Sequence, residues 1–425
     1  MTDVAPTEFG APTADHGRFP GWWVVAGCFT VLTVSSGLGF YGLAVYLNAF
    51  SKEREWPLST ISLATTVFFV VGGIVGVWVA RWTARYDVRV VIAAGGVVGG
   101  LALGVLGQVE HQWQLFVVYA VFAAGWAAAG LVPATTVVTR WFHAKRSVAL
   151  SVASTGLSIG GIAITPFAKQ LLDSQGLEAG TPWLGAVFVV GIVPVGWFVV
   201  RPDPESEGWA PDGIRRAVGE VAPPLTGVAF ADAIRTRFFI AVTIGFLLAL
   251  GAQVGGIQQL VKLVEDRTDE RTAQFALTAI AGTSVVARLV GGRVVQRVPM
   301  MSMTVGLVAA QAVALVVIGV AEATWLLFAA IILFGATIGN VLMLQPLLIA
   351  ERFGVRDYPR LFSRAQLVAV VGTAGGPLLL GALFDVFGSY RVPYAIAAGC
   401  SLAGAVVLSF GGPATVVADG DGHHA

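Results

Sequence analysis

Residues 140–161 read RWFHAKRSVALSVASTGLSIGG, and residues 352–376 read RFGVRDYPRLFSRAQLVAVVGTAGG. Each stretch has an aromatic residue at the end of an apolar run, then a basic loop, then a new apolar run with a G-x-x-x-G core. A second pair of segments, 79–89 (VARWTARYDVR) and 290–299 (VGGRVVQRVP), also follows apolar runs at corresponding places. The chain therefore consists of two related halves.

The composition is that of an integral membrane protein, with most of the chain inside the membrane. Hydrophobic residues make up 56% of the 425 and charged residues 12%, whereas charged residues make up about 25% of a typical soluble domain. The net charge of +1 and the lack of a basic patch predict no nucleic-acid partner. Cys28 and Cys400 both lie in apolar runs, so we expect no disulfide framework and no metal site. We also expect no cofactor.

Twelve apolar runs are long enough to cross a bilayer, which takes about 20 residues in a helix. They cover roughly 21–49, 59–80, 90–107, 114–139, 147–171, 183–200, 238–262, 273–296, 301–320, 324–349, 363–386 and 391–411. We therefore expect an all-α integral membrane fold with twelve transmembrane helices in two six-helix, pseudo-symmetric halves. Repeated halves of this kind are typical of the large transporter folds.

The expected units follow from one long polar connection between the sixth and seventh runs. It is rich in charge, Pro and Gly, which is typical of a flexible linker. The units are an N-terminal tail (1–20), an N-terminal half (21–200), the linker (201–237), a C-terminal half (238–411) and a C-terminal tail (412–425).

The 26 Lys and Arg residues predict the orientation. With Met1 in the cytoplasm, eighteen of them fall in cytoplasmic segments and seven on the outer side, and Arg288 is left over inside a span. This bias follows the positive-inside rule. We expect a multi-pass protein of the cytoplasmic membrane with both termini in the cytoplasm.

Two short patterns resemble enzyme motifs without their context. GLGFYG (37–42) fits a phosphate-binding glycine pattern, but it lies inside an apolar helix rather than after a strand. GLSIG (156–160) fits a serine-nucleophile pattern, but none of the five histidines lies in a span interior where it could serve as the base. We expect helix contacts at both patterns, and no enzyme activity.

Four stretches together resemble the major facilitator superfamily, and within it the branch of monocarboxylate transporters and oxalate:formate antiporters. They are PGWWVVAGCF (20–29), with the GWW of bacterial members, YGLAVYLNAF (41–50), residues 140–161, and VARLVGG (286–292). The resemblance covers about residues 20 to 411. It implies a secondary transporter that works by alternating access, with Arg288 at the position where the family places a substrate-binding arginine.

The loop motif of the superfamily is altered in this chain. Where that motif carries an aspartate, the first copy has Ala84 and the second has Gln296; Ala80 and Asp87 replace its two glycines. The acidic residue normally helps to hold one face of the bundle closed. The resemblance therefore leaves open how this chain stabilises that state, with Arg81, Arg85 and Arg89 as candidates.

Two further departures bear on the cargo. Animal members couple transport to protons through a lysine in span one and an aspartate in span eight, whose positions here are Tyr41 and Ser284. Oxalate antiporters carry a lysine in span eleven, where this chain has only Arg364 near the cytoplasmic end. A single cation at the membrane midplane favours a monocarboxylate over a dicarboxylate.

Arg288 is the main candidate site residue. It lies within a turn of the centre of the span 273–296, where an arginine costs about 2.5–3.5 kcal/mol on insertion scales. One interpretation is structural, a salt bridge or a cap on backbone carbonyls that holds helices together. The other is a binding site for a substrate carboxylate, which matches the planar fork of the guanidinium. The apolar runs contain no deeply placed carboxylate that could pair with Arg288, and this favours the substrate-binding interpretation.

The remaining candidates form two groups. The first would line the path around Arg288, with ordinary packing as the alternative: Tyr41, Tyr119, Trp126, Gln253, Ser284 and Asn340. The second would gate the cytoplasmic loops, with membrane topology as the alternative: Arg81, Arg85, Arg89, Lys145, Arg146 and Arg297.

The sequence therefore predicts a secondary active transporter for a small monocarboxylate, driven by proton symport or by anion exchange. Its expected partners are the organic anion, a proton or a counter-anion, and the lipid bilayer, and we expect it to function as a monomer. The alternatives are an efflux pump for amphipathic drugs, in which Arg288 would be dispensable, and a membrane sensor without flux.

Overall fold

The computed structural model describes residues 19–213 and 225–414, apart from the side chains of residues 58, 59, 270, 274 and 277. Most of both expected tails and the middle of the expected linker lie outside these residues. The named elements of the described residues are all helices, and an isolated β-bridge joins Gly227 and Gly354. This confirms the all-α fold.

The first half of the chain forms eight α-helices, some of which continue into short π or 3₁₀ segments. These elements are α1 (Gly21–Ser35), η1 (Ser36–Tyr41), α2 (Gly42–Glu53), α3 (Leu58–Arg85), α4 (Val88–Val105), η2 (Leu106–Gln108), α5 (Gln112–Ala128), α6 (Leu131–Trp141), α7 (Arg146–Ile159), η3 (Gly160–Ile164), α8 (Thr165–Pro194) and η4 (Val195–Val199).

The rest of the chain begins with short turns of the linker and continues with six long helices. These elements are η5 (Glu205–Glu207), η6 (Pro211–Gly213), α9 (Phe230–Ala233), α10 (Arg237–Arg267), α11 (Glu270–Val294), α12 (Met300–Val320), α13 (Thr324–Phe353), α14 (Tyr358–Phe387) and α15 (Arg391–Ser409).

Eleven helical stretches of the described residues are long and apolar enough to span a membrane. One of them, Arg146–Val199, has 54 residues, which at 1.5 Å per residue would measure about 80 Å, far more than the roughly 30 Å of a bilayer core. Gly176 breaks this stretch with a left-handed φ of 77°. The stretch is therefore long enough for two crossings, and the described residues provide the twelve crossings that the sequence predicts.

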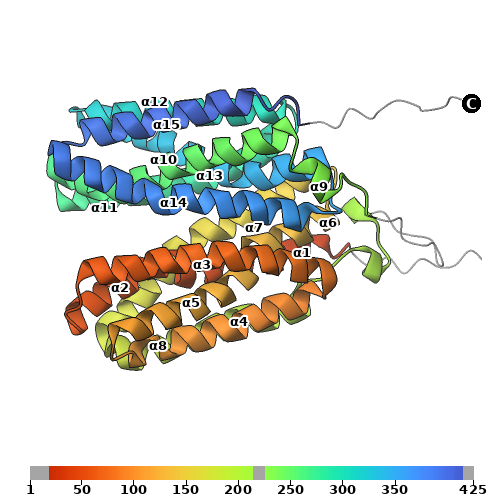
Figure 1. Cartoon of the computed structure of the whole chain (residues 1–425), viewed down its shortest axis with the longest axis horizontal. Helices are drawn as coiled ribbons and strands as arrows, with labels where there is room; N and C mark the ends of the chain where they lie inside the picture. The colour runs from red at the N-terminus through yellow and green to blue at the C-terminus, as the bar shows by residue number, and fades with distance from the viewer. Residues whose placement is uncertain (1–18, 214–224, 415–425) are drawn as a thin grey trace, which may run out of the picture.

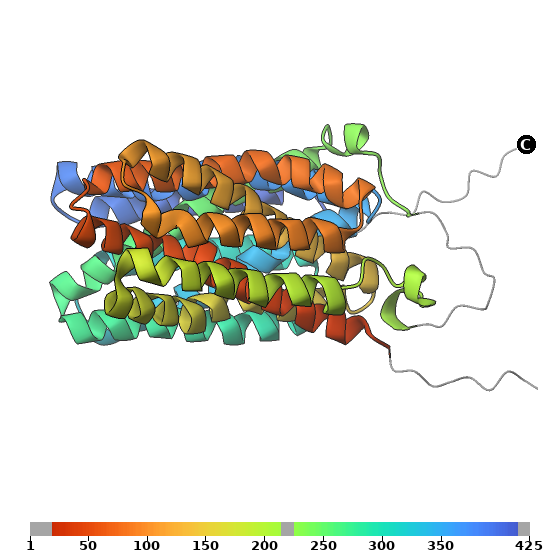
Figure 2. The same ribbon diagram turned by 90° about the horizontal axis from the view of Figure 1, so that it is seen from below.

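The helices form two bundles, one from each half of the chain (Figure 1). Within the bundles α4 packs on α8, and α10 packs on α14 and α15. The described linker segments lie at one end of the molecule, which we call the linker end (Figures 1 and 2). Between the bundles α7 contacts α11 and α13, and α3 contacts α14.

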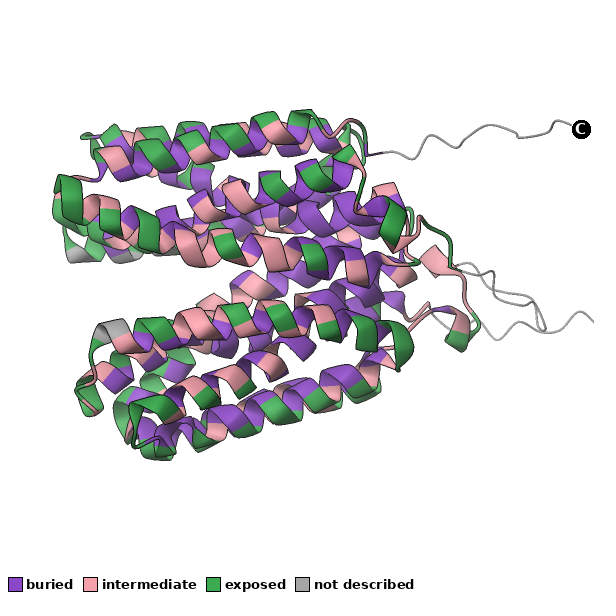
Figure 3. Cartoon of the chain, viewed as in Figure 1, coloured by how far each residue is buried: buried purple, intermediate pink, exposed green. Residues whose placement is uncertain are grey.

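Buried residues concentrate along the axis where the bundles meet, and exposed residues face outward along the outer helices (Figure 3). Many of the outward side chains are large and apolar, as expected for surfaces in contact with lipid. Buried faces therefore line the contacts within each bundle and the contact between the two bundles.

Glycines allow the closest helix contacts, including those at the two enzyme-like patterns of residues 37–42 and 156–160. A Cβ at Gly160 would lie 2.3 Å from the carbonyl oxygen of Thr33 and 2.7 Å from the nitrogen of Gly37. The G-x-x-x-G stretch at the junction of α7 and η3 therefore packs directly on α1 and on the glycine-rich π-helix η1, which is the helix contact that the sequence predicts.

Candidate functional site

Helices α7 and α11 run side by side in antiparallel order, and hydrogen bonds join them across the two halves. We call this contact the seam. Its pairs are Gln296 Nε2 with Ala144 O (3.3 Å), Ser147 Oγ with Gly292 O (2.8 Å), Arg288 Nη1 with Ser154 O, and Ser158 Oγ with Ser284 Oγ (3.3 Å). The seam therefore runs from the linker end to the level of Ser284, one turn beyond Arg288.

Arg288 lies in the seam and has no exposed surface. Its Nε donates to the carbonyl oxygen of Gly339 in α13 at 2.6 Å, and its Nη1 donates to the carbonyl oxygen of Ser154 in α7. Its Nη2 is buried without a hydrogen-bond partner among the described residues. No described carboxylate bonds to this guanidinium, so a buried cation retains unused donors.

Arg267 provides a comparison, because its described hydrogen bonds only cap the end of a helix. Its two terminal nitrogens donate to three carbonyls at the end of α12, at 2.7 Å each: Ile318 O, Gly319 O and Ala321 O. The last carbonyls of a helix have no intrahelical partner, so Arg267 satisfies groups that need a donor.

The carbonyls that hold Arg288 are of another kind. Ser154 and Gly339 lie inside α7 and α13, at least four residues before each helix ends, so their oxygens can already accept intrahelical hydrogen bonds. These carbonyls do not require the arginine. They accept a second hydrogen bond and so position a charge that costs free energy to bury.

Close packing of α11 on α13 sets the position of Arg288. A Cβ at Gly339 would lie 2.1 Å from the carbonyl oxygen of Ser284, and one at Gly335 would lie 3.0 Å from that of Ile280. The small residues of α13 therefore bring its backbone against α11, where Gly339 O reaches the Arg288 side chain.

Tyr41 and Ser284 are the two expected path residues nearest to Arg288 among those with a described relation to it. The phenol of Tyr41 lies within electrostatic range of Arg288, without a described hydrogen bond to it, and its ring packs over Gly161 of η3. Tyr41 is 40% exposed.

Ser284 is buried, and its hydroxyl lies against that of Ser158. Ser284 also donates to the carbonyl of Ala281 at 3.1 Å. This pair is the last hydrogen bond of the seam among the described residues, so two hydroxyls from opposite halves lie one turn from the arginine.

Asn340 and Gln253 are both buried, with different surroundings. Asn340 Nδ2 donates to Ala287 O and to Ala336 O, both at 3.0 Å, so its side chain joins α13 to α11. Its Oδ1 lies against Gly291 and has no described donor. Gln253 of α10 has an unpartnered Oε1, and no described contact connects it to Arg288.

Tyr119 and Trp126 pack inside the N-terminal half. The Tyr119 ring contacts Phe68, and its hydroxyl is buried without a described partner. Trp126 donates from Nε1 to Ser35 O at 3.1 Å and lies against Gly39. Neither has a described contact with Arg288, so these two side chains are placed by packing on α3, α1 and η1.

Arg146 closes the linker end beside the seam. Its guanidinium is buried, donates from Nε to Phe142 O, and pairs with Glu351 of α13 at 3.5 Å. The backbone nitrogen of its neighbour Lys145 bonds to the carboxylate of Asp212 in the linker, at 3.2 Å. Asp212 also accepts from the two preceding backbone nitrogens, so the linker caps the start of α7.

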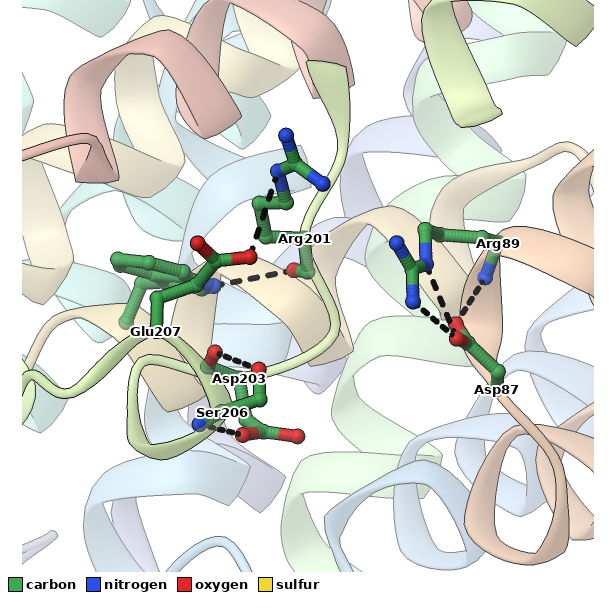
Figure 4. Close-up of polar contacts among 7 residues, drawn as sticks. Asp87, Arg89, Arg201, Asp203, Ser206 and Glu207 are labelled. Carbon is green, nitrogen blue, oxygen red and sulfur yellow. Dashed lines mark hydrogen bonds and ion pairs between the residues drawn. The ribbon is translucent and has the colours of Figure 1, made fainter. Parts of the chain in front are cut away.

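The other basic loop residues make local contacts. Arg89 forms a fork with Asp87 at its own helix start, from Nε at 2.9 Å and Nη2 at 2.7 Å (Figure 4). Burial raises the pKa of the Asp87 carboxyl, but the hydrogen bonds and charge of Arg89 lower it by more, so its pKa lies below the ordinary value. Arg81 and Arg85 lie over aromatic rings of their own helix region, and Arg297 is exposed. None of these four bridges to another long helix by a described side-chain contact.

Sequence reasoning missed four members of this arrangement: Ser147, Ser158, Glu351 and Asp212. Ser158 stood out only as part of a false nucleophile pattern. Glu351 precedes Arg352 at a basic end of α13, so no local charge pattern marked the Arg146–Glu351 pair.

Comparison with known proteins gives a consistent result. The sequence model of the family described as "Major Facilitator Superfamily" matches residues 29–344 and 260–421. The chain is 24% identical to "Monocarboxylate transporter 13" of Rattus norvegicus over 398 residues, covering 91% of this chain and 88% of that protein. It is also 24% identical to an "MFS-type transporter" of Gibberella moniliformis over 409 residues, covering 92% and 90%.

Two solved structures share the fold. The human organic anion transporter MFSD10 aligns with a TM-score of 0.69 at 14% identity, over 92% of this chain and all of that one. The transporter FucP, in the outward conformation, aligns with a TM-score of 0.71 at 14% identity, over 92% and 98%.

Proposed function

The chain belongs to the Major Facilitator Superfamily, and on this premise we propose that it carries a small monocarboxylate across the cytoplasmic membrane by alternating access. It is a membrane transporter rather than an enzyme, as the family and fold establish. The cargo, its direction and its driving ion belong to the proposal.

One observation carries the proposed cargo: the buried guanidinium of Arg288 keeps Nη2 without a described partner. A buried charge is strongly unfavourable unless it is paired, and the two carbonyls at Nε and Nη1 carry no net charge. A carboxylate that enters the space beside Tyr41 would supply both the missing acceptor and the missing counter-charge.

Two features support a cargo with a single carboxylate. Arg288 is the cation at the centre of the seam, whereas Arg364 of α14 is exposed and lies in the second turn of its helix. Relatives named monocarboxylate transporters match this chain over most of its length. The ring of Tyr41 would pack against the organic part of the anion.

The cross-half contacts support a cycle in which the linker end opens and closes. Among the described residues, every side-chain hydrogen bond between the halves lies between the linker end and the Ser158–Ser284 level. This state is therefore sealed toward the linker, and the halves would rock about Arg288 to expose the site there.

The orientation and coupling complete the proposal. The excess of Lys and Arg at the linker end supports a cytoplasmic position for this end and for both termini. With Ser284 in place of an acid beside Arg288, a proton would travel with the substrate or with water, or a second anion would return in exchange. The two-bundle fold supports one complete path in each chain, and so a functional monomer.

Uptake into proteoliposomes tests the function. Wild type and Arg288→Ala are compared with labelled lactate, benzoate and oxalate, and with a lipophilic cationic dye. We expect saturable uptake of a monocarboxylate by the wild type and loss of it in the variant. Dye transport that survives in Arg288→Ala would instead support a drug-efflux pump, and unimpaired carboxylate uptake by the variant would contradict the site.

A pH gradient imposed in the same vesicles separates the two driving forces. Proton symport predicts uptake that follows the inward proton gradient in vesicles without internal anion. Exchange predicts uptake that needs a preloaded anion and is insensitive to that gradient.

A further inference from the structure

Helix α3 presents an outward stripe whose chemistry changes along its length. Leu63, Val70 and Ile74 are exposed on this stripe, and they are followed toward the linker end by exposed Trp78 and Trp82. The last four of these residues repeat every four positions, so they lie along one face of the helix. In a membrane protein such an exposed apolar face contacts lipid.

The stripe ends in two arginines that make no described ion pair. Arg81 and Arg85 are both exposed, one turn apart. The guanidinium carbon of Arg81 lies 4.9 Å from the centre of the Trp78 ring, and that of Arg85 lies 5.8 Å from the centre of the Tyr86 ring. The aromatic faces thus orient both guanidinium groups at the edge of the lipid-facing surface.

The order of side chains matches the layers of a phospholipid leaflet. Aliphatic residues match the acyl chains, Trp78 and Trp82 match the interfacial zone, where tryptophan is enriched, and the arginines match the level of the phosphate. Arginine binds phosphate oxygens through two parallel N–H groups. The nearest acid along the chain, Asp87, is already bonded to Arg89 (Figure 4).

We propose that this end of α3 is a binding site for the headgroup of an anionic phospholipid. The phosphate lies between Arg81 and Arg85, and the glycerol and upper acyl carbons lie along Trp78 and Trp82. Because Ala84 stands between the two arginines, the site has no carboxylate of its own to attract the amine of a zwitterionic headgroup. The proposal concerns the lipid surface and does not depend on the identity of the cargo.

The second half of the chain contains a natural control. Arg293 lies in the last turn of α11 and Arg297 just after it, with the same spacing as Arg81 and Arg85 in the last turns of α3 and at the same end of the molecule. The exposed neighbours of these two arginines are Val294 and Val298 instead of aromatic rings. Removal of either pair changes the net charge of the linker end equally, so general attraction to an anionic membrane would respond equally to both.

The test is native mass spectrometry of the full-length protein in detergent, titrated with phosphatidylglycerol or phosphatidylcholine. We expect the wild type to bind phosphatidylglycerol more tightly than phosphatidylcholine. Each arginine near an anionic lipid contributes about fivefold, so Arg81→Gln/Arg85→Gln should weaken the tightest phosphatidylglycerol site by roughly 25-fold. Arg293→Gln/Arg297→Gln should leave that site unchanged.

Equal weakening by both double variants would overturn the proposal, and so would an unchanged affinity in Arg81→Gln/Arg85→Gln or equal binding of the two lipids by the wild type. If the first double variant does not fold, the wild type is labelled with a photoactivatable phosphatidylglycerol. Cross-links concentrated in residues 78–86 would support the site. Cross-links equally frequent in residues 290–299 would overturn it.

Discussion

Arg288 of α11 donates a hydrogen bond to the carbonyl oxygen of Ser154 in α7, so the cation at the centre of one half is bonded to the other half. The linker end cannot open at this level unless that bond breaks. A carboxylate that binds the free Nη2 can accept a second hydrogen bond from Nη1, where it competes with the carbonyl of Ser154, so cargo binding and the parting of the halves become linked. The following predictions rest on this relationship.

A transported monocarboxylate should make the linker end of the seam more accessible. Ser147 is buried in the seam, where its hydroxyl bonds to Gly292 O, so a cysteine at this position reports opening. In a background with Cys28→Ala and Cys400→Ala, we expect Ser147→Cys to react faster with a maleimide when the cargo is added. The rate in detergent should not change with cargo when Arg288→Gln is also present. Faster labelling on addition of cargo in both proteins would show that opening does not depend on Arg288.

The Arg146–Glu351 pair should favour the sealed state. Glu351→Gln removes the charge that faces the buried Arg146 across the halves. The carboxylate is more than one-third exposed, so the pair contributes about 0.5–1 kcal/mol, and the basal maleimide rate at Ser147→Cys should rise about two- to fivefold. Glu322→Gln is the control, because Glu322 pairs with Arg391 on the exposed surface. An equal maleimide rate at Ser147→Cys with and without Glu351→Gln would show that this pair does not hold the linker end closed.

An acid at position 284 should make transport depend on pH. Ser284 lies one helical turn before Arg288, a spacing at which side chains meet. The new carboxylate of Ser284→Asp should pair with the guanidinium when ionised and so reduce uptake of the anion at neutral pH. Uptake should recover as the pH falls and the carboxylate takes up a proton. Ser284→Asn has the same shape without the charge, and matching pH profiles for the two variants would refute the pairing.

Contact between α11 and α13 should be intolerant of one methyl group. A Cβ at Gly339 would lie 2.1 Å from a backbone oxygen of α11, which can move only if the helices separate. We expect Gly339→Ala to destabilise the protein by about 1–3 kcal/mol and to reduce uptake, because Gly339 O also holds Arg288. Gly282→Ala on α11 is the control, since a Cβ there meets nothing within 4 Å. The thermal unfolding midpoint in detergent should fall only for the first variant.

The sequence predicts the membrane fold well because its signals are local. Twelve apolar runs, a polar linker and one charge inside a span can be read without knowledge of which helices touch. The position of Arg288 and the lack of a carboxylate for it follow from the same reading. The glycine patterns at 37–42 and 156–160 are likewise explained by their helical context.

Backbone carbonyls were one expected kind of partner for Arg288, but the sequence could not predict which carbonyls they are. Every residue carries a carbonyl, so Ser154 and Gly339 have no side-chain signature as acceptors. The sequence also could not predict which way Tyr119 and Trp126 point. Their helix is apolar all around, so its pattern does not mark an inner side. These contacts depend on helix packing over long sequence separations.

Equilibrium binding of a labelled monocarboxylate to purified protein tests the central claim most directly, because it isolates Arg288 from the transport cycle. Charge-assisted hydrogen bonds contribute about 1.5–3 kcal/mol, so Arg288→Gln should raise the Kd by about tenfold to more than a hundredfold. Arg267→Gln removes an arginine that only caps a helix, and its Kd should match the wild type. A wild-type Kd in folded Arg288→Gln would contradict the account.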